Sequence, residues 1–201
     1  MAGRDPPWGL FADLLEYPRA DVVETARQCQ SLVAPVSPEA GQRLAEFGAF
    51  AAPLPLGKLQ EVFIGIFDLE AAWSPYVGYH ILGESYKRSA FLVGLKERYA
   101  ACGFTPARNE LPDHLAVLLR FLSVCREEEV TKVIVEEALI PAIDRMTGKV
   151  ASEGYEEGSS PSRGQHDHPY RGVLEAVRLA LMATRGASDA EAAAPGGGAR
   201  A

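Results

Sequence analysis

Cysteine is scarce in this chain, and its three copies are widely separated. Cys29, Cys102 and Cys125 form no C-x-x-C pair, so the sequence indicates neither a disulfide framework nor a zinc site. We therefore expect buried free thiols. Long apolar runs are also missing, because no stretch approaches the roughly 18 consecutive apolar residues that a membrane span needs. Any association with a membrane would then have to come through a partner.

The amino end lacks the uninterrupted apolar region of a secretory signal. Asp5, Asp13 and Glu16 interrupt every apolar run there, so we expect the chain to stay in the cytoplasm.

The chain has fewer basic than acidic residues: 20 Lys and Arg residues against 27 Asp and Glu residues give a formal net charge of −7. This balance disfavours nucleic-acid binding, which requires a basic face to neutralise phosphates. An acidic protein suits a basic partner instead.

The composition is that of an ordinary globular chain. Its 201 residues fit one domain, and 47% hydrophobic with 23% charged residues is a typical balance. Sustained β-branched alternation and fixed-period repeats are both absent, so the sequence predicts an all-α, single-domain helical bundle. We expect this domain to cover residues 1–185, with a mobile loop at 148–169, and a disordered tail to cover 186–201.

Apolar residues at helical spacing predict the individual helices. The expected segments are approximately 10–17, 21–32, 38–52, 56–73, 84–102, 112–122, 128–146 and 170–184. Ser37 followed by Pro38 is typical of an N-cap and first helical residue. Gly103 can take the positive φ that ends a helix. Pro112 is expected to start a helix, and Pro141 to kink or split one.

Three short strings stand out in the middle of the chain. They are F-D-L at 67–69, H-x-x-G-E-S-x-x-R at 80–88 and E-L-P-D-H-L at 110–115. None of them is a nucleotide loop, a zinc knuckle or a catalytic triad. They contain carboxylates that can in principle do acid–base work, yet nothing supplies a nucleophile with an orienting base or a phosphate-cradling loop. We therefore expect no enzymatic activity.

Several residues in these strings also have a purely structural interpretation. Glu84 and Arg88 are four apart, which on an exposed helix contributes about 0.3–0.5 kcal/mol. Asp113, expected in the first turn after Pro112, would be stabilised by the helix N-terminus in any protein. His114 can hydrogen-bond through either ring nitrogen and bridge to a neighbouring helix. Spacing alone leaves both roles open.

The histidines raise the question of a metal site. His166 and His168 alternate in a polar segment, but a structural site needs about four convergent ligands, so we expect a solvated loop and no bound metal. A helical metal-dependent hydrolase would need a pattern such as E-x-x-H on a helix. Glu110 and His114 are four apart, but Pro112 is expected to leave Glu110 outside the helix.

Taken together, the three strings resemble the nitrate reductase delta-subunit branch of the redox-enzyme maturation chaperones. In that family P-D-H preceded by a glutamate or by E-L is the hallmark, and residues 110–115 match it. The branch adds an aromatic-Asp-Leu string and G-E-S-x-x-R. The resemblance is strong over 56–122 and weaker over L-L-E-Y-P at 14–18. Tyr86 and Ser89 depart from the basic or polar residue and the glycine usual in the branch, which leaves open a different molybdenum enzyme as the client.

The resemblance implies a cytoplasmic helical chaperone without a permanently bound cofactor. It would bind the N-terminal peptide of an apo catalytic (alpha) subunit while the client receives its bis-molybdopterin guanine dinucleotide, acting as a monomer or weak dimer. Acidic residues beside an apolar groove would bind a basic, amphipathic peptide. The residues implied in client binding are Asp68, Glu84, Arg88, Glu110, Asp113 and His114. The alternative is a permanent structural subunit of an oxidoreductase complex.

Overall fold

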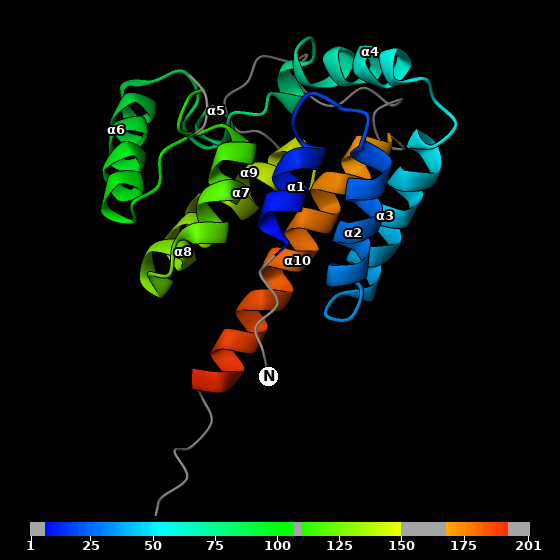
Figure 1. Ribbon diagram of the computed structural model, residues 1–201. Helices are drawn as coiled ribbons and strands as arrows, with labels where there is room; N and C mark the ends of the chain where they lie inside the picture. The colour runs from blue at the N-terminus through cyan, green and yellow to red at the C-terminus, as the bar shows by residue number, and fades with distance from the viewer. Residues whose placement is uncertain (1–6, 107–109, 150–167, 193–201) are drawn as a thin grey trace, which may run out of the picture.

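The computed structural model describes residues 7–106, 110–149 and 168–192 (Figure 1). Within these ranges the regular structure is helical, apart from one isolated antiparallel bridge between Tyr76 and His114. The predicted all-α fold is confirmed. Among the described helices, none combines the length and apolarity that a membrane crossing requires.

The helices follow one another with short connections. In chain order they are α1 (Trp8–Leu14), α2 (Val22–Val33), α3 (Pro38–Ala51), α4 (Leu56–Phe67), the 3₁₀ turn η1 (Ala71–Trp73), α5 (Val77–Leu82), α6 (Tyr86–Ala101), α7 (Leu115–Val124), α8 (Glu128–Ile134), the π-helical turn η2 (Val135–Leu139), α9 (Ile140–Met146) and α10 (Pro169–Ala192).

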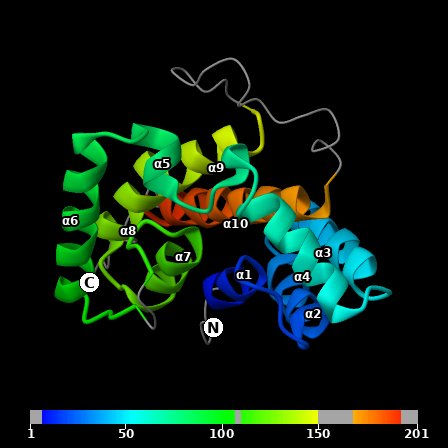
Figure 2. The ribbon, with the colours of Figure 1, turned by 90° about the horizontal axis from the view of Figure 1, so that it is seen from above.

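Helix α10 lies at the centre of the bundle. Figures 1 and 2 show α2 and α3 on one side of it and α5 to α9 on the other, with α6 at the far edge. α10 packs against α1, α3 and α9. Its large buried apolar side chains recur at helical spacing, and they are Tyr170, Val173, Leu174, Val177 and Leu181. Burying such a stripe stabilises the helix more than its intrinsic propensity does.

Local signals located several helix ends correctly. The Ser37 hydroxyl accepts a hydrogen bond from the Ala40 N–H at 3.4 Å, and Pro38 is the first residue of α3. Gly103 takes φ +66° just after α6, a conformation that glycine adopts without steric cost. Pro141 lies at the start of α9, directly after the π-helical turn η2. The helix expected at 128–146 is therefore not split: its backbone stays helical throughout, and the irregularity expected at Pro141 takes the form of the π-helical turn before it.

The start of α7 was predicted too early, and α5 was not predicted at all. The helix begins at Leu115 rather than Pro112, so Asp113 precedes the first turn. The reason is the bridge with the segment before α5: the Val77 N–H donates to the Asp113 carbonyl at 2.8 Å, and the Leu115 N–H donates to the Pro75 carbonyl at 2.8 Å. Pro112 and Asp113 instead form a turn, closed by a hydrogen bond from the His114 N–H to the Leu111 carbonyl at 3.1 Å, and His114 then caps α7.

The carboxyl-terminal expectations are tested only in part. Most of the predicted loop at 148–169 lies outside the described residues. α10 continues to Ala192, past Gly186, where the sequence suggested that helical structure would stop. The remainder of the expected tail, 193–201, also lies outside the described residues.

Candidate functional site

A groove of about 870 Å³ lies among α1, the turn after α4, the segment before α5 and the start of α7. Elements far apart in sequence meet here because the Tyr76–His114 bridge fastens the segment before α5 to the start of α7. Residues of the first string (67–69) and of the third string (110–115) line the groove. The groove is therefore the natural candidate for the functional site.

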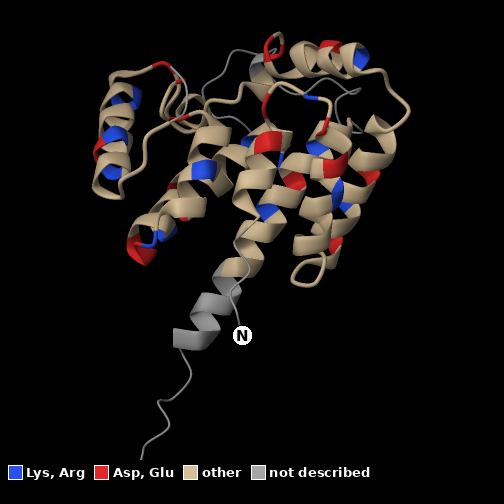
Figure 3. Ribbon diagram, viewed as in Figure 1, with Lys and Arg blue, Asp and Glu red and all other residues tan. Residues whose placement is uncertain are grey.

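The charged lining of the groove is predominantly acidic. It contains five carboxylates against two guanidinium groups, namely Asp13, Glu16, Asp68, Glu70 and Glu110 against Arg19 and Arg120. Asp68, Glu70 and Glu110 are exposed to solvent. Figure 3 shows acidic residues in the turn that follows α4. A cleft with one predominant sign of charge attracts ligands of the opposite sign.

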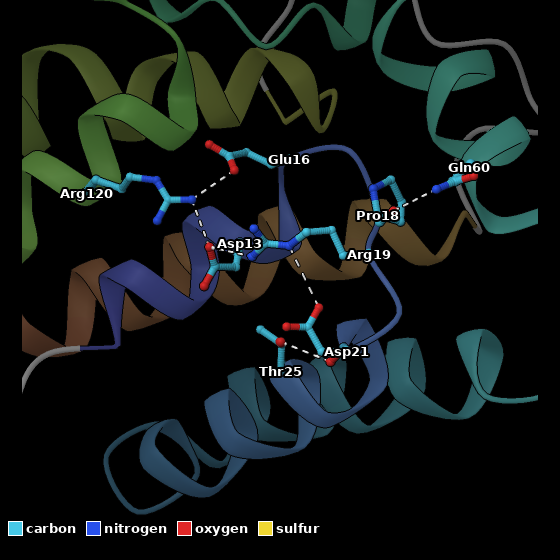
Figure 4. Close-up of polar contacts among 8 residues, drawn as sticks. All are labelled: Asp13, Glu16, Pro18, Arg19, Asp21, Thr25, Gln60 and Arg120. Carbon is cyan, nitrogen blue, oxygen red and sulfur yellow. Dashed lines mark hydrogen bonds and ion pairs between the residues drawn. The ribbon is translucent and has the colours of Figure 1, made fainter. Parts of the chain in front are cut away.

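One wall of the groove is held by an ionic network between α1 and α7. One nitrogen of Arg120, Nη2, lies 2.8 Å from Asp13 Oδ1 and 2.9 Å from Glu16 Oε2 (Figure 4). Arg19 approaches the same Asp13 at 3.5 Å and Asp21 at 3.8 Å. Asp13 and Glu16 are thus already compensated by arginines of the chain itself, whereas Asp68, Glu70 and Glu110 form no ion pair with an arginine or lysine among the described residues.

The groove also presents apolar surface. Leu69 is 76% exposed and Tyr17 is 50% exposed. Beneath them, the rings of Phe63 and Phe67 pack with centroids 4.7 Å apart, and the edge of Tyr17 meets Phe63 at 6.1 Å. Exposed apolar side chains beside exposed carboxylates form a surface that suits an amphipathic ligand.

Tyr76 connects the groove to the residues behind it. Its hydroxyl donates to Glu110 Oε1 at 3.0 Å, and its ring contacts His114 edge-on at 5.5 Å. The guanidinium of Arg88 lies 5.6 Å from the centre of the same ring, within the range of a cation–π interaction. Burial, together with the hydrogen bond to Glu110, raises the pKa of Tyr76 to about 12, so the phenol stays protonated.

Behind this ring lies a buried ion pair. Arg88 Nε donates to Asp113 Oδ2 at 3.0 Å, and the Asp113 side chain is fully buried. Gly78 permits the approach, because a Cβ at that position would lie 2.7 Å from Asp113 Oδ2 and 3.2 Å from Arg88 Cγ. The other Asp113 oxygen, Oδ1, accepts no hydrogen bond from the described residues. A buried carboxylate of this kind depends strongly on its single cationic partner.

Two histidines of the strings, the buried His80 and the half-buried His114, both have lowered pKa values. His80 Nε2 donates to the Ser74 carbonyl at 2.7 Å, and burial lowers the pKa of His80 from 6.5 to about 4. His114 caps α7 through Nδ1, which accepts from the Ala116 N–H at 3.2 Å. Burial also lowers the pKa of His114. Capping through Nδ1 leaves Nε2 of His114 as the protonated ring nitrogen.

The predicted site residues fall into three groups. Asp68, Glu110 and His114 line the groove. Arg88 and Asp113 form the ion pair behind it, so in this conformation Asp113 cannot contact a ligand directly. Glu84 is exposed and forms no hydrogen bond or ion pair with the described residues. The expected Glu84–Arg88 helix pair is not formed, because α6 begins only at Tyr86 and Arg88 turns to Asp113 instead.

Other groove residues were not predicted from the sequence. Asp13, Glu16 and Tyr17 come from α1 and its following turn, where L-L-E-Y-P carried only a weak resemblance. Arg120 offered a clearer signal, since it interrupts the otherwise apolar α7. A charged residue inside an apolar helix usually has a specific partner. The partners of Arg120 are Asp13 in α1 and Glu16 just after it.

The described histidines do not assemble a metal centre. Across 7–106, 110–149 and 168–192, no group of three or more His, Cys, Asp or Glu side chains is placed to hold a metal ion. His168 stacks on Tyr170 and accepts from the Tyr170 N–H at 3.2 Å. His166 lies outside the described residues.

Comparison with known proteins assigns the chain to a family. The family described as nitrate reductase delta subunit matches residues 34–145, more than half of the chain and all three strings. The chain belongs to the nitrate reductase delta subunit family. It is also 32% identical over 87 residues to a Bacillus subtilis (strain 168) protein named probable nitrate reductase molybdenum cofactor assembly chaperone NarJ. That match covers 43% of this chain and 47% of the Bacillus protein, so it spans about half of the relative's length.

Proposed function

We propose that this protein is an assembly chaperone for a nitrate reductase-like molybdenum oxidoreductase, and that its groove binds the N-terminal peptide of the apo catalytic subunit. The family match and the name of the Bacillus relative support the chaperone role. The observation that carries the peptide-binding role is that residues from two of the three strings, Asp68 with Leu69 and Glu110 with His114, line one acidic groove.

The groove has the two properties that a basic, amphipathic peptide requires. Asp68 and Glu110 are exposed carboxylates that can accept charge-assisted hydrogen bonds from arginine or lysine. Leu69 and Tyr17 supply apolar contact on the same surface. A peptide helix with one apolar and one basic side would satisfy both sets of groups together.

The proposed role involves no catalytic step by the chaperone. The protein holds the apo subunit in the cytoplasm while bis-molybdopterin guanine dinucleotide is inserted into the client, and then dissociates as a monomer or weak dimer. Arg88 and Asp113 act as positioning residues, because their ion pair supports Tyr76, which in turn holds Glu110 at the groove. Glu84 extends the acidic surface outside the groove.

Calorimetry with the client's N-terminal peptide tests the proposal. The double variant Asp68→Asn with Glu110→Gln removes two exposed charges from the groove, and we expect it to weaken binding at least about tenfold, or about 1.4 kcal/mol. Raising the salt concentration should weaken wild-type binding more than binding by the variant, because surface charges are screened. Leu69→Ser should lower affinity without changing the salt dependence.

Glu24→Gln is the matched control, since Glu24 is an exposed carboxylate on α2 that does not line the groove. Equal affinity of wild type and both groove variants for the peptide would refute the groove assignment. Stoichiometric co-purification of the protein with the mature, cofactor-loaded enzyme would favour a permanent structural subunit instead.

A further inference from the structure

Two of the three cysteines meet although they are remote in sequence. Cys102 follows α6, Cys125 follows α7, and their Sγ atoms lie 2.7 Å apart as free thiols. A disulfide bond is about 2.05 Å long, so bond formation needs an approach of only about 0.7 Å. The third thiol, Cys29, is fully buried in α2 and is not part of this pair.

Aromatic packing holds the ends of α6 and α7 against each other at this point. The rings of Tyr99 and Phe121 have centroids 4.7 Å apart, and Phe104 contacts both, at 5.1 Å and 5.6 Å. The Tyr99 hydroxyl also donates to the Pro112 carbonyl at 2.6 Å. These contacts pack the segments that carry the two thiols against each other.

The two thiols differ in access. Cys102 is partly exposed, whereas Cys125 is 6% exposed. The hydrogen bond with Cys125, followed by burial, raises the pKa of Cys102 to about 11, so exchange at neutral pH is slow. A small oxidant can thus reach Cys102 from solvent, while Cys125 lies directly behind it in the position of a resolving thiol.

We propose that Cys102 and Cys125 form a reversible intramolecular disulfide that clamps the end of α6 to the end of α7. With a low-molecular-weight disulfide such as glutathione disulfide as the oxidant, the Cys102 thiolate attacks one sulfur and displaces one glutathione thiolate. The Cys125 thiolate then attacks Cys102 Sγ and displaces the second glutathione. Two protein thiols are oxidised, one glutathione disulfide is reduced to two thiols, and both thiol protons end on the released glutathione.

The clamp would restrict the segment that carries the third string. The disulfide closes a loop from Cys102 to Cys125, and residues 110–115 lie inside it. Closing such a loop lowers the entropy of the unfolded chain and favours the folded state. In a reducing compartment such a bond would be transient, as is typical of redox-responsive pairs. This inference stands independently of the proposed client.

Mass spectrometry of the full chain tests the proposal. Reduced protein is incubated with glutathione disulfide, and the intact mass is measured with and without a reductant; remaining thiols are then alkylated after denaturation for peptide mapping. Before alkylation we expect a product lighter than the reduced chain by two hydrogens, and after alkylation we expect a single alkyl group, on Cys29, and a Cys102–Cys125 linkage in the peptide map. The oxidised form should melt several degrees higher, and amide exchange at the end of α6 should slow.

Cys102→Ser, at a partly exposed position, should abolish the product, whereas Cys29→Ala should form it like the wild type. A glutathione adduct that persists on Cys102, a dimer linked through Cys102, or alkylation of all three thiols would each overturn the proposed bond. An intramolecular disulfide that changed neither the melting temperature nor the exchange at α6 would overturn the clamp.

Discussion

The two sides of the bundle differ in the polar contacts that accompany their apolar packing. On the α2–α3 side, apolar side chains pack against α10, and ion pairs such as Glu24–Arg27 lie on the surface. On the α5–α6 side, apolar packing is accompanied by polar contacts from buried groups, including Arg88–Asp113 and the hydrogen bond from His80 to the Ser74 carbonyl. Two of the three strings lie in this second region. The string residues therefore maintain local geometry as well as presenting groups to the groove.

Breaking the buried Arg88–Asp113 ion pair should lower the free energy of unfolding more than any other change considered below. Arg88→Ala leaves the fully buried Asp113 without its partner, and we expect the free energy of unfolding to fall by about 3–5 kcal/mol. Arg27→Ala on α2 removes an exposed pair and should leave the urea midpoint unchanged. Urea denaturation of both variants measures the contrast. Equal midpoints for Arg88→Ala and Arg27→Ala would mean that the two regions do not differ in this way.

Lowering the pH should reduce the free energy of unfolding, because the buried His80 is held neutral in the folded protein. Its pKa is lowered from 6.5 to about 4 in the folded protein, so between these values the unfolded chain binds more protons and stability falls as pH falls. The full effect of this shift is on the order of 3 kcal/mol. His80→Gln should flatten the dependence of the unfolding free energy on pH between 6.5 and 4. Parallel profiles for variant and wild type would exclude His80 as a source of the pH dependence.

Adding a methyl group at Gly78 should reduce the stability of the fold by a smaller amount. Its Cβ would lie 2.7 Å from Asp113 Oδ2 and 3.1 Å from a Phe91 ring carbon, so Gly78→Ala should cost about 1–3 kcal/mol through overpacking. Gly65→Ala in α4 is the control, because a Cβ there meets nothing within 4 Å and alanine favours a helix. Thermal unfolding should therefore move in opposite directions for the two variants. A stabilised Gly78→Ala would show that the ion pair tolerates displacement.

The sequence correctly predicted helix ends that depend only on a few neighbouring residues. Ser37 with Pro38 began α3 as expected, and Gly103 ended α6, because capping and positive φ are decided within a few residues. The six residues of α5 are too few for a helical period to be recognised. The start of α7 was misplaced because a backbone bridge to residues 75–77 overrode the signal from Pro112.

The site was predictable only in outline. The strings identified Asp68, Glu110 and His114 as candidates, and all three line the groove. The helical spacing of residues in the sequence could not show that Arg88 would pair with Asp113, 25 residues away, rather than with Glu84, four residues away. That choice depends on the packing of α5 against α6 beside Gly78, which is a tertiary feature.

The central position of α10 has a consequence for biosynthesis. The ribosome makes α10 after every other described element, yet its buried residues, from Tyr170 to Leu181, fill the middle of the core. Nascent chains that stop before Pro169 would expose the apolar faces of α3 and α9, against which α10 packs. Folding of this bundle must therefore be completed late in translation, and premature termination upstream of α10 should yield aggregation-prone fragments rather than a smaller stable domain.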